Sequence, residues 1–309
     1  MQRYLGNPRG AACVQCNKVA ERRVSNFQSG VSIIQKVVHL TVRRFVLVAA
    51  ALLFTCVAPL ARAQSTAPKD AEEAHAAAVP ATAATAAPVV PQKVDPILES
   101  YERAIGGRQA WEKFTSQVLM GTIAVPSMNL TGTIMVHEKA PNKFLSAVII
   151  NGAVFRQGFD GIQGWTDDPK NGLRDQTGAE LTESKRGADF LHAFKMGRAY
   201  AKIVVTGAEK IGERDTWVIE ATAPEGGDPT KMYFDTRTGL LLRVVSQNHD
   251  ADGVSQLQED FDDYRVVDGV RIPFVWRQTN GDTTYTLMFS EVQHNVELVD
   301  SEFAKPAAQ

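Results

Sequence analysis

The sequence predicts a mainly β fold with a few helices: a strongly curved antiparallel meander, or incomplete β-barrel, whose helices cover an apolar cavity. From Gln117 onward, apolar residues recur with the period of two typical of strands, and turn residues separate the runs. Several runs, among them 147–150 and 240–242, are apolar at every position, which indicates that both faces of the sheet are covered. The helical segments are too few to cover a flat sheet, so a curved sheet around a cavity is favoured. A well-filled sandwich without a cavity is the alternative.

Residues 1–63 are predicted to be a leader and signal peptide, which places the exported protein in the periplasm. A basic pair at 43–44 precedes an apolar run over 45–60, and an A-x-A pattern follows it, so we expect cleavage between Ala63 and Gln64. The run is shorter than the roughly 20 residues of a membrane span. We therefore expect no retained transmembrane helix; an uncleaved membrane anchor is the alternative.

Charge is distributed unequally between the leader and the rest of the chain. Residues 1–63 carry nine Lys or Arg and one acid, whereas residues 64–309 carry 24 basic and 34 acidic side chains. An acidic body argues against nucleic acid as a partner, because phosphate binding needs a basic surface.

Since the leader is long for a signal peptide, we expect translation to start near residues 37–42. Lipidation at Cys56 is a further alternative to simple cleavage.

The exported part is predicted to consist of a disordered tether and one domain. Residues 64–92 are rich in Ala, Pro and Thr and lack large apolar side chains, so they cannot offset the entropy lost on ordering. Residues 93–309 are enough for one domain with a core of its own.

Two short helices are expected to open this domain. Pro96 suits a first helical turn, and Gly106 with Gly107 provides a stop. Apolar side chains at helical spacing between them are Ile97, Leu98, Tyr101 and Ile105. A second helix is expected over 108–114.

Strands make up most of the remaining domain. They are expected over 117–125, 129–138, 143–150, 153–159, 162–167, 202–208, 215–222, 230–235, 239–247, 254–264, 270–279 and 283–293. A break is expected over 168–178 and a helical stretch over 180–201.

Explicit turn residues support this meander. Asn-Gly at 151–152 and Asp-Gly at 268–269 are typical of two-residue hairpins, in which both residues take positive φ. The pattern F-D-x-x-x-G-apolar occurs twice, starting at Phe159 and at Phe234, and reads as a strand ending in an Asp-initiated turn.

The sequence contains no recognisable catalytic or metal-binding motif. All three cysteines lie within residues 1–63, so thiol catalysis and thiolate metal sites are not expected in the exported part. HExxH, GxSxG, P-loop and Rossmann patterns do not occur. We therefore predict no catalytic residue, no metal ligand and no cofactor. The acidic run 259–263 is expected to be a solvated edge that discourages aggregation.

Large apolar side chains are the best candidates for the wall of a cavity. The candidates for ligand binding are Trp111, Met120, Phe144, Phe159, Trp165, Phe190, Phe194, Trp217 and Phe289. Ordinary core packing is the alternative for each of them.

Several motifs resemble those of the LolA/LolB-like outer-membrane lipoprotein-sorting family, in particular an exported bacterial subgroup. The resemblance covers about residues 95–306 and rests on the segments 142–144, 158–165, 185–190, 233–243 and 263–273, which include GFDGxxGW and DYRxVDGVxIP. It implies an incomplete antiparallel barrel in which helices form a lid over an apolar cavity able to hold acyl chains.

These observations lead to one preferred function and two alternatives. The preferred function is a periplasmic, non-enzymatic carrier or binding protein for lipidated proteins or acyl chains, in outer-membrane lipoprotein sorting. Its partners would be the acyl chains of lipoproteins or other lipids, with an envelope protein as a further partner. The first alternative is a structural or adaptor domain of an envelope complex without a ligand. The second is an enzyme whose carboxylates are assembled by folding near Trp165 or Tyr264.

Overall fold

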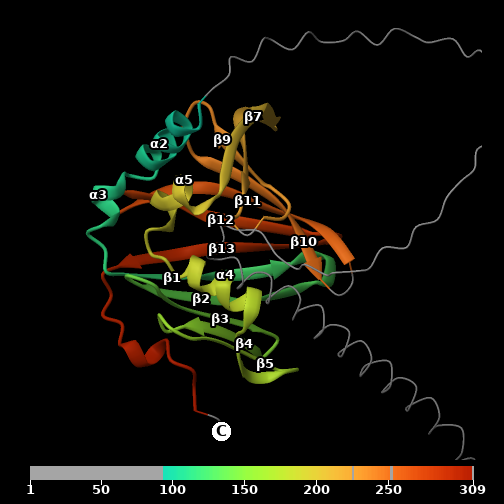
Figure 1. The fold of residues 1–309 in the computed structure, drawn as a ribbon. Coiled ribbons are helices and arrows are strands. Elements are labelled where there is room, and N and C mark those ends of the chain that lie inside the picture. The colour runs from blue at the N-terminus through green and yellow to red at the C-terminus, as the bar shows by residue number, and fades with distance from the viewer. Residues whose placement is uncertain (1–92, 225, 251–252, 308–309) are drawn as a thin grey trace, which may run out of the picture.

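The structure is a computed structural model that describes residues 93–224, 226–250 and 253–307. The leader, signal peptide and tether predicted over 1–92 lie outside these residues. Thirteen antiparallel strands form one continuous sheet in the described part, and Figure 1 shows this sheet curving beside a small set of helices. The predicted curved antiparallel meander with few helices is confirmed.

The strand bounds agree with the predicted runs to within a few residues, apart from one additional strand. The strands are β1 Ser116–Val125, β2 Leu130–Lys139, β3 Lys143–Ile150, β4 Ala153–Phe159, β5 Gly164–Asp168, β6 Gly172–Asp175, β7 Lys202–Ile211, β8 Arg214–Thr222, β9 Thr230–Asp235, β10 Leu241–Asp250, β11 Gly253–Val267, β12 Val270–Asn280 and β13 Thr283–His294. The helices are α2 Val94–Ala104, α3 Arg108–Trp111, α4 Gly178–Gly187 and α5 Met196–Ala199, with 3-10 helices η1 Pro126–Met128, η2 His192–Lys195 and η3 Asp300–Glu302.

The first and the last strand lie side by side in the middle of the sheet. β1 pairs with β2 on one side and with β13 on the other, so the order is β6-β5-β4-β3-β2-β1-β13-β12-β11-β10-β9-β8-β7. β6 and β7 are therefore the two edges, although the chain runs directly from one to the other. Residues 178–199, which we call the lid segment, make this connection and carry α4, η2 and α5 across the inner side of the sheet (Figure 1).

The break predicted over 168–178 is wrong, because part of it forms the edge strand β6. The Asp168 carboxylate accepts hydrogen bonds from the backbone N–H groups of Lys170 (2.9 Å) and Asn171 (2.8 Å). This turn folds the chain back, so that β6 pairs with β5.

The helix predicted over 180–201 is divided. An irregular turn separates α4 from η2 and α5. Within it, the Asp189 carboxylate accepts a hydrogen bond from the backbone N–H of Leu191 (3.1 Å), and the backbone N–H of Phe190 donates to the Pro141 carbonyl (3.0 Å). Both contacts remove backbone donors from a helical ladder, and the second ties the lid segment to the β2–β3 turn.

α2 has the amphipathic pattern predicted for it and packs on the second half of the sheet. The Tyr101 ring meets Phe234 of β9 edge-on at 5.5 Å between centroids. The helix is followed by Gly106, whose φ is +110°, and a Cβ there would lie 2.9 Å from the Gly269 carbonyl oxygen. Glycine thus lets the end of α2 approach the β11–β12 hairpin. The buried side chains of α2 are Ile97, Leu98, Tyr101 and Ala104.

The chain after β13 covers the outer face of the first half of the sheet. Phe303 is fully buried and packs with Val118 and Leu298. The Trp165 indole Nε1–H donates to the Phe303 carbonyl (2.9 Å), and the Lys139 ammonium pairs with the Asp300 carboxylate (2.7 Å). Both faces of β1 are therefore covered at Val118. The apolar run 240–242 is buried throughout, as predicted, whereas Ile149 of the run 147–150 is 45% exposed, so this second run does not have both faces covered.

The acidic run 259–263 does not lie at an edge, contrary to the prediction. β11 pairs with β10 and β12, so it is an interior strand. Glu259 is completely buried, whereas Asp260 pairs with Arg243 (2.6 Å) on the opposite face. The alternation of β11 divides the acids between two environments.

The predicted turns are confirmed. Asn151 (φ +51°) with Gly152 (φ +79°), and Asp268 (φ +50°) with Gly269 (φ +88°), take the positive angles of two-residue hairpins. The repeated F-D-x-x-x-G pattern ends its first strand at Asp160, whose carboxylate accepts hydrogen bonds from the N–H groups of the second and third residues after it (2.8 and 2.7 Å).

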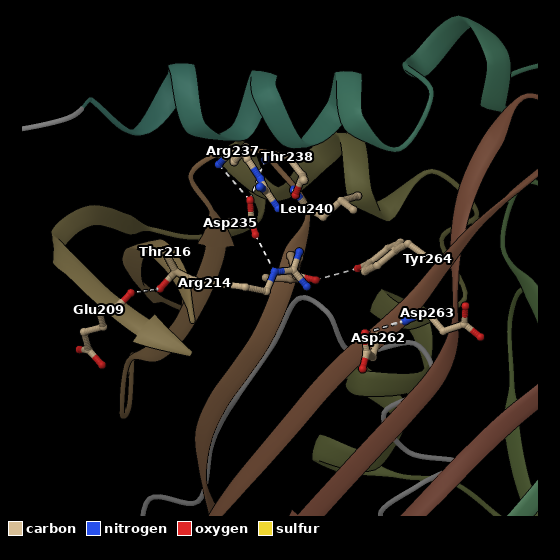
Figure 2. Close-up of polar contacts among 11 residues, drawn as sticks. Glu209, Arg214, Thr216, Asp235, Arg237, Thr238, Leu240, Asp262, Asp263 and Tyr264 are labelled. Carbon is tan, nitrogen blue, oxygen red and sulfur yellow. Dashed lines mark hydrogen bonds and ion pairs between the residues drawn. The ribbon is translucent and has the colours of Figure 1, made fainter. Parts of the chain in front are cut away.

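The second copy of this turn, at Asp235, has an additional partner and lies beneath α2 (Figure 2). Its carboxylate accepts hydrogen bonds from the N–H groups of Arg237 (2.9 Å) and Thr238 (2.7 Å) and from the Arg214 guanidinium (2.7 Å). Burial by itself raises the pKa of Asp235. The hydrogen bonds from Thr238 and Arg214 lower this pKa by more than burial raises it, so the pKa lies below its ordinary value. The ionised carboxylate therefore stabilises the fold above its ordinary pKa, and this stabilisation is lost as the pH falls through the lowered value.

We expect the substitution Asp235→Asn to lower the free energy of unfolding by about 2 kcal/mol at neutral pH, because a buried, charge-assisted hydrogen bond to Arg214 is lost. Urea denaturation of the purified protein measures this. Asp160→Asn is the matched control: it retains the oxygen that accepts from the turn and should cost under about 1 kcal/mol. Equal losses in the two variants would contradict the role assigned to Arg214.

Candidate functional site

A cavity of about 140 Å³ lies between the inner face of the sheet and the helices that cover it. α2 and α3 bound it on one side, the lid segment on another, and strands from both halves of the sheet form its floor. Apolar side chains from these elements in its wall include Ile105, Trp111, Leu119, Phe190, Trp276 and Phe289.

Three of the predicted cavity residues line this space: Trp111, Phe190 and Phe289. Phe194 belongs to the same cluster without being part of the wall, since its ring lies 6.5 Å from that of Trp111. Trp111 also meets Phe190 edge-on at 6.5 Å, and its indole Nε1–H donates to the Ile105 carbonyl (3.0 Å). It therefore joins the lid segment to the end of α2 in the wall of the cavity.

Two further candidates lie on the inner face but outside the wall. Phe144 and Phe159 are cross-strand neighbours on β3 and β4, and they pack against Ala188 beneath α4. Because Ala188 itself lines the cavity, these rings support the lid segment from below.

The remaining candidates lie elsewhere. Met120 packs on the outer face with the cluster around Phe303, and Trp165 hydrogen-bonds to the same segment. Trp217 of β8 is the cross-strand neighbour of Phe234, away from the cavity. Met120 shows why the assignment was not possible from sequence: its neighbours on β1 are apolar on both faces, so alternation alone does not indicate which face is inside.

A row of polar side chains begins in the cavity wall at Glu138 and Gln117 and runs to the protein surface. Gln117 of β1 has Glu138 of β2 as one cross-strand neighbour and His294 of β13 as the other. The Gln117 amide nitrogen donates to Glu138 Oε2 (3.4 Å), and its oxygen lies 3.1 Å from His294 Nε2. His294 Nδ1 lies 2.8 Å from the exposed Asp268 carboxylate. The row thus connects a carboxyl in the cavity wall to a carboxylate at the protein surface.

The inner end of this row is strongly desolvated. Burial raises the pKa of Glu138 from 4.5 to about 7, because its carboxyl faces an apolar cavity. The His294 side chain is 1% exposed, and the ring of Phe114 is stacked on it at 3.9 Å between centroids. Gln117 is also buried.

The other charged groups in the wall have partners within the protein. Asp189 pairs with the Lys195 ammonium at 2.6 Å, and the Arg271 guanidinium donates to the Ala104 carbonyl (3.2 Å). His192 Nδ1 donates to the Asp189 carbonyl (3.0 Å), and burial is the main reason why the pKa of His192 is lowered.

Sequence analysis missed Glu138 and Gln117. One indication was available: Ile134, Val136 and Glu138 alternate along one predicted strand, so a carboxyl occupies a position on an otherwise buried face. The contribution of β13 was not visible, because it depends on pairing between strands about 170 residues apart.

The described residues hold no group of three or more His, Cys, Asp or Glu side chains arranged to bind a metal ion. None of the helices in the described part of the chain has the length and hydropathy of a membrane span.

Neither a protein-family model nor a curated protein matches the sequence. Among solved structures, the chain is similar to a DUF1329 family protein from Desulfovibrio piger, at 15% identity and a TM-score of 0.47, over 68% of this chain and 97% of the other. It is also similar to a LolA superfamily protein from Nitrosomonas europaea, at 16% identity and a TM-score of 0.45, over 70% of this chain and 98% of the other. A third match, MucB in complex with MucA(peri), has 13% identity and a TM-score of 0.21, over 70% of this chain and 60% of the other.

A LolA superfamily protein is thus among the structural matches. Identities of 13–16% with TM-scores under 0.5 transfer no ligand or role to this chain.

We expect the Glu138 carboxyl to titrate near pH 7 in the folded protein, which carboxyl NMR measures directly. The folded state then binds more protons than the unfolded state between pH 4.5 and about 7. The free energy of unfolding should therefore decrease by about 2 kcal/mol as the pH rises through this window, a value for a partly solvated carboxyl. The substitution Glu138→Gln should abolish this decrease. The control Glu291→Gln, at an exposed position on β13, should leave this pH dependence unchanged. A Glu138 midpoint near 4.5 would contradict this environment.

Proposed function

We propose that this chain is a periplasmic, non-enzymatic carrier or binding protein for lipidated proteins or other acyl-chain ligands, acting in outer-membrane lipoprotein sorting. One observation carries the proposal: an apolar cavity lies between the inner face of the curved sheet and helices that are not part of it. The resemblance of the sequence motifs to the LolA/LolB-like family supports the same function.

The energetics of hydrocarbon burial suit such a site. Each methylene moved from water into an apolar cavity contributes about 0.8 kcal/mol, so a chain of a dozen carbons has enough gross free energy for binding without a covalent bond. Trp111, Phe190 and Phe289 would supply the contact surface. No serine, threonine or cysteine is among the described residues that line the cavity, which favours binding over covalent catalysis.

A long chain requires the cavity to enlarge. Its volume of about 140 Å³ is close to that of an engineered cavity of about 150 Å³ that binds one benzene molecule. The lid segment is the element that would move, because it connects the edge strands β6 and β7 and shares no strand pairing with the floor.

Hydrogen bonds, an ion pair and apolar packing hold the lid segment in place. The Arg174 guanidinium of β6 pairs with the Glu180 carboxylate of α4 (2.7 Å). The Arg108 guanidinium donates to the Phe194 carbonyl (2.7 Å), and the backbone N–H of Phe190 donates to the Pro141 carbonyl (3.0 Å). Apolar packing adds to these contacts, as where Trp111 meets Phe190 and Phe194. An acyl chain that entered the cavity would replace this packing with its own.

Native mass spectrometry of the purified protein, with organic extraction of the same sample, tests whether a lipid or an acylated peptide is bound. Titration with N-phenyl-1-naphthylamine, a neutral apolar fluorophore, and its displacement by 1-dodecanol then measure access to the cavity. We expect a bound ligand or, after delipidation, saturable and competitive binding.

Ala193→Trp should weaken dodecanol binding by about tenfold or more, because Ala193 lines the cavity from the lid segment and an indole would occupy it. Ala199→Trp is the matched control, since Ala199 is a half-buried residue of the same segment outside the cavity wall. Equal effects of the two substitutions would place binding elsewhere. A protein that stays without ligand in both assays would favour the adaptor function.

A further inference from the structure

We propose that Glu138, oriented by Gln117, binds a cationic head group, so that the ligand of this cavity is an amphiphile with an ammonium group beside its hydrocarbon chain. This inference rests on the proposed function, because it names the class of ligand for the same cavity.

The position of Glu138 is the first observation. Its cross-strand neighbours are Phe144 and Gln117, and Leu119 and Phe289 belong to the same cavity wall. A carboxyl in such a wall lies where the polar end of an otherwise apolar ligand would be recognised. Its raised pKa, which burial causes, agrees with a carboxyl that has no cation beside it.

The distribution of charge is the second observation. Asp189, the other carboxylate of the wall, is paired with Lys195, and the Arg271 guanidinium donates to a backbone carbonyl. Glu138 forms no ion pair with any residue in the described part of the chain, and Gln117 is its one hydrogen-bonding side chain there. Because a buried carboxylate is stabilised chiefly by an opposite charge, a cation supplied by the ligand would complete the site.

The orientation of Gln117 is the third observation. Its amide nitrogen donates to Glu138, while its oxygen lies 3.1 Å from His294 Nε2, where it can accept a hydrogen bond. His294 Nδ1 in turn lies 2.8 Å from the Asp268 carboxylate. In this arrangement Gln117 supports the ionised form of Glu138, which is the form that attracts an ammonium group. Gln117 also separates Glu138 from His294.

These contacts predict an order of affinity among ligands with the same chain. A 12-carbon amine would pair its ammonium with Glu138, a 12-carbon alcohol would make only a neutral hydrogen bond, and dodecanoate would bring a second negative charge to the site. A pair of like charges in a low-dielectric wall is unfavourable, so dodecanoate should bind most weakly.

Displacement of N-phenyl-1-naphthylamine by dodecylamine, 1-dodecanol and dodecanoate tests this order with one set of chains, at about pH 8, where Glu138 is ionised. We expect dodecylamine to bind at least about tenfold more tightly than 1-dodecanol, and dodecanoate more weakly than either. In Glu138→Gln the ratio of amine to alcohol affinity should fall to within about threefold of one. Glu291→Gln, which removes an exposed charge from β13, should leave the ratio as in the wild type.

The outcomes separate the two proposals. If 1-dodecanol fails to displace the fluorophore, the carrier function itself is contradicted. If 1-dodecanol binds but the amine binds no better, or keeps its advantage in Glu138→Gln, the head-group site is overturned and the carrier function stands. Should Glu138→Gln not fold, the wild type alone decides: the advantage of the amine should vanish as the pH falls from about 8 to about 5.5, because Glu138 becomes protonated. An advantage that persists at the lower pH would overturn the assignment.

Discussion

The pairing of β1 with β13 is the constraint on which the rest of the structure depends. It joins two meanders, β1 to β6 and β7 to β13, into one sheet through their first and last strands. The edges are then β6 and β7, which are consecutive in the chain, so their connection has to pass from one edge of the sheet to the other. The lid segment is the result: it crosses the inner side of the sheet, and a cavity remains beneath it.

The two faces of the sheet are covered by different parts of the chain, and this division decides where a ligand could enter. The outer face of the first strands is held by the segment around Phe303 through the Trp165 hydrogen bond and the Lys139–Asp300 ion pair. The inner face is covered by α2, α3 and the lid segment, which are held by packing around Trp111 and by the Arg174–Glu180 ion pair. Packing of this kind can be exchanged for contacts with a hydrocarbon chain, whereas separating paired strands breaks their backbone hydrogen bonds.

Within this cavity the polar row from Glu138 to Asp268 gives the site its chemical character. A purely apolar cavity would distinguish ligands by size and shape alone, whereas a buried carboxyl distinguishes them by charge. The strand pairing that creates the lid also builds the row, because Gln117 and His294 are neighbours only through β1 and β13. The pairing of β1 with β13 therefore accounts for both the lid segment and the proposed selectivity for the head group.

Local patterns in the sequence were sufficient for twelve of the thirteen strands in the described part of the chain, the hairpins at 151–152 and 268–269 and the Asp-initiated turns at Asp160 and Asp235. These features depend on residues close together in the chain, where φ preferences and side-chain alternation act directly. The placement of Met120 and Trp165 on the outer face, the burial of Glu259 and the polar row at Glu138 were set by tertiary structure. Each depends on which strand or segment covers a given face, and strand alternation leaves that choice open when both faces are apolar.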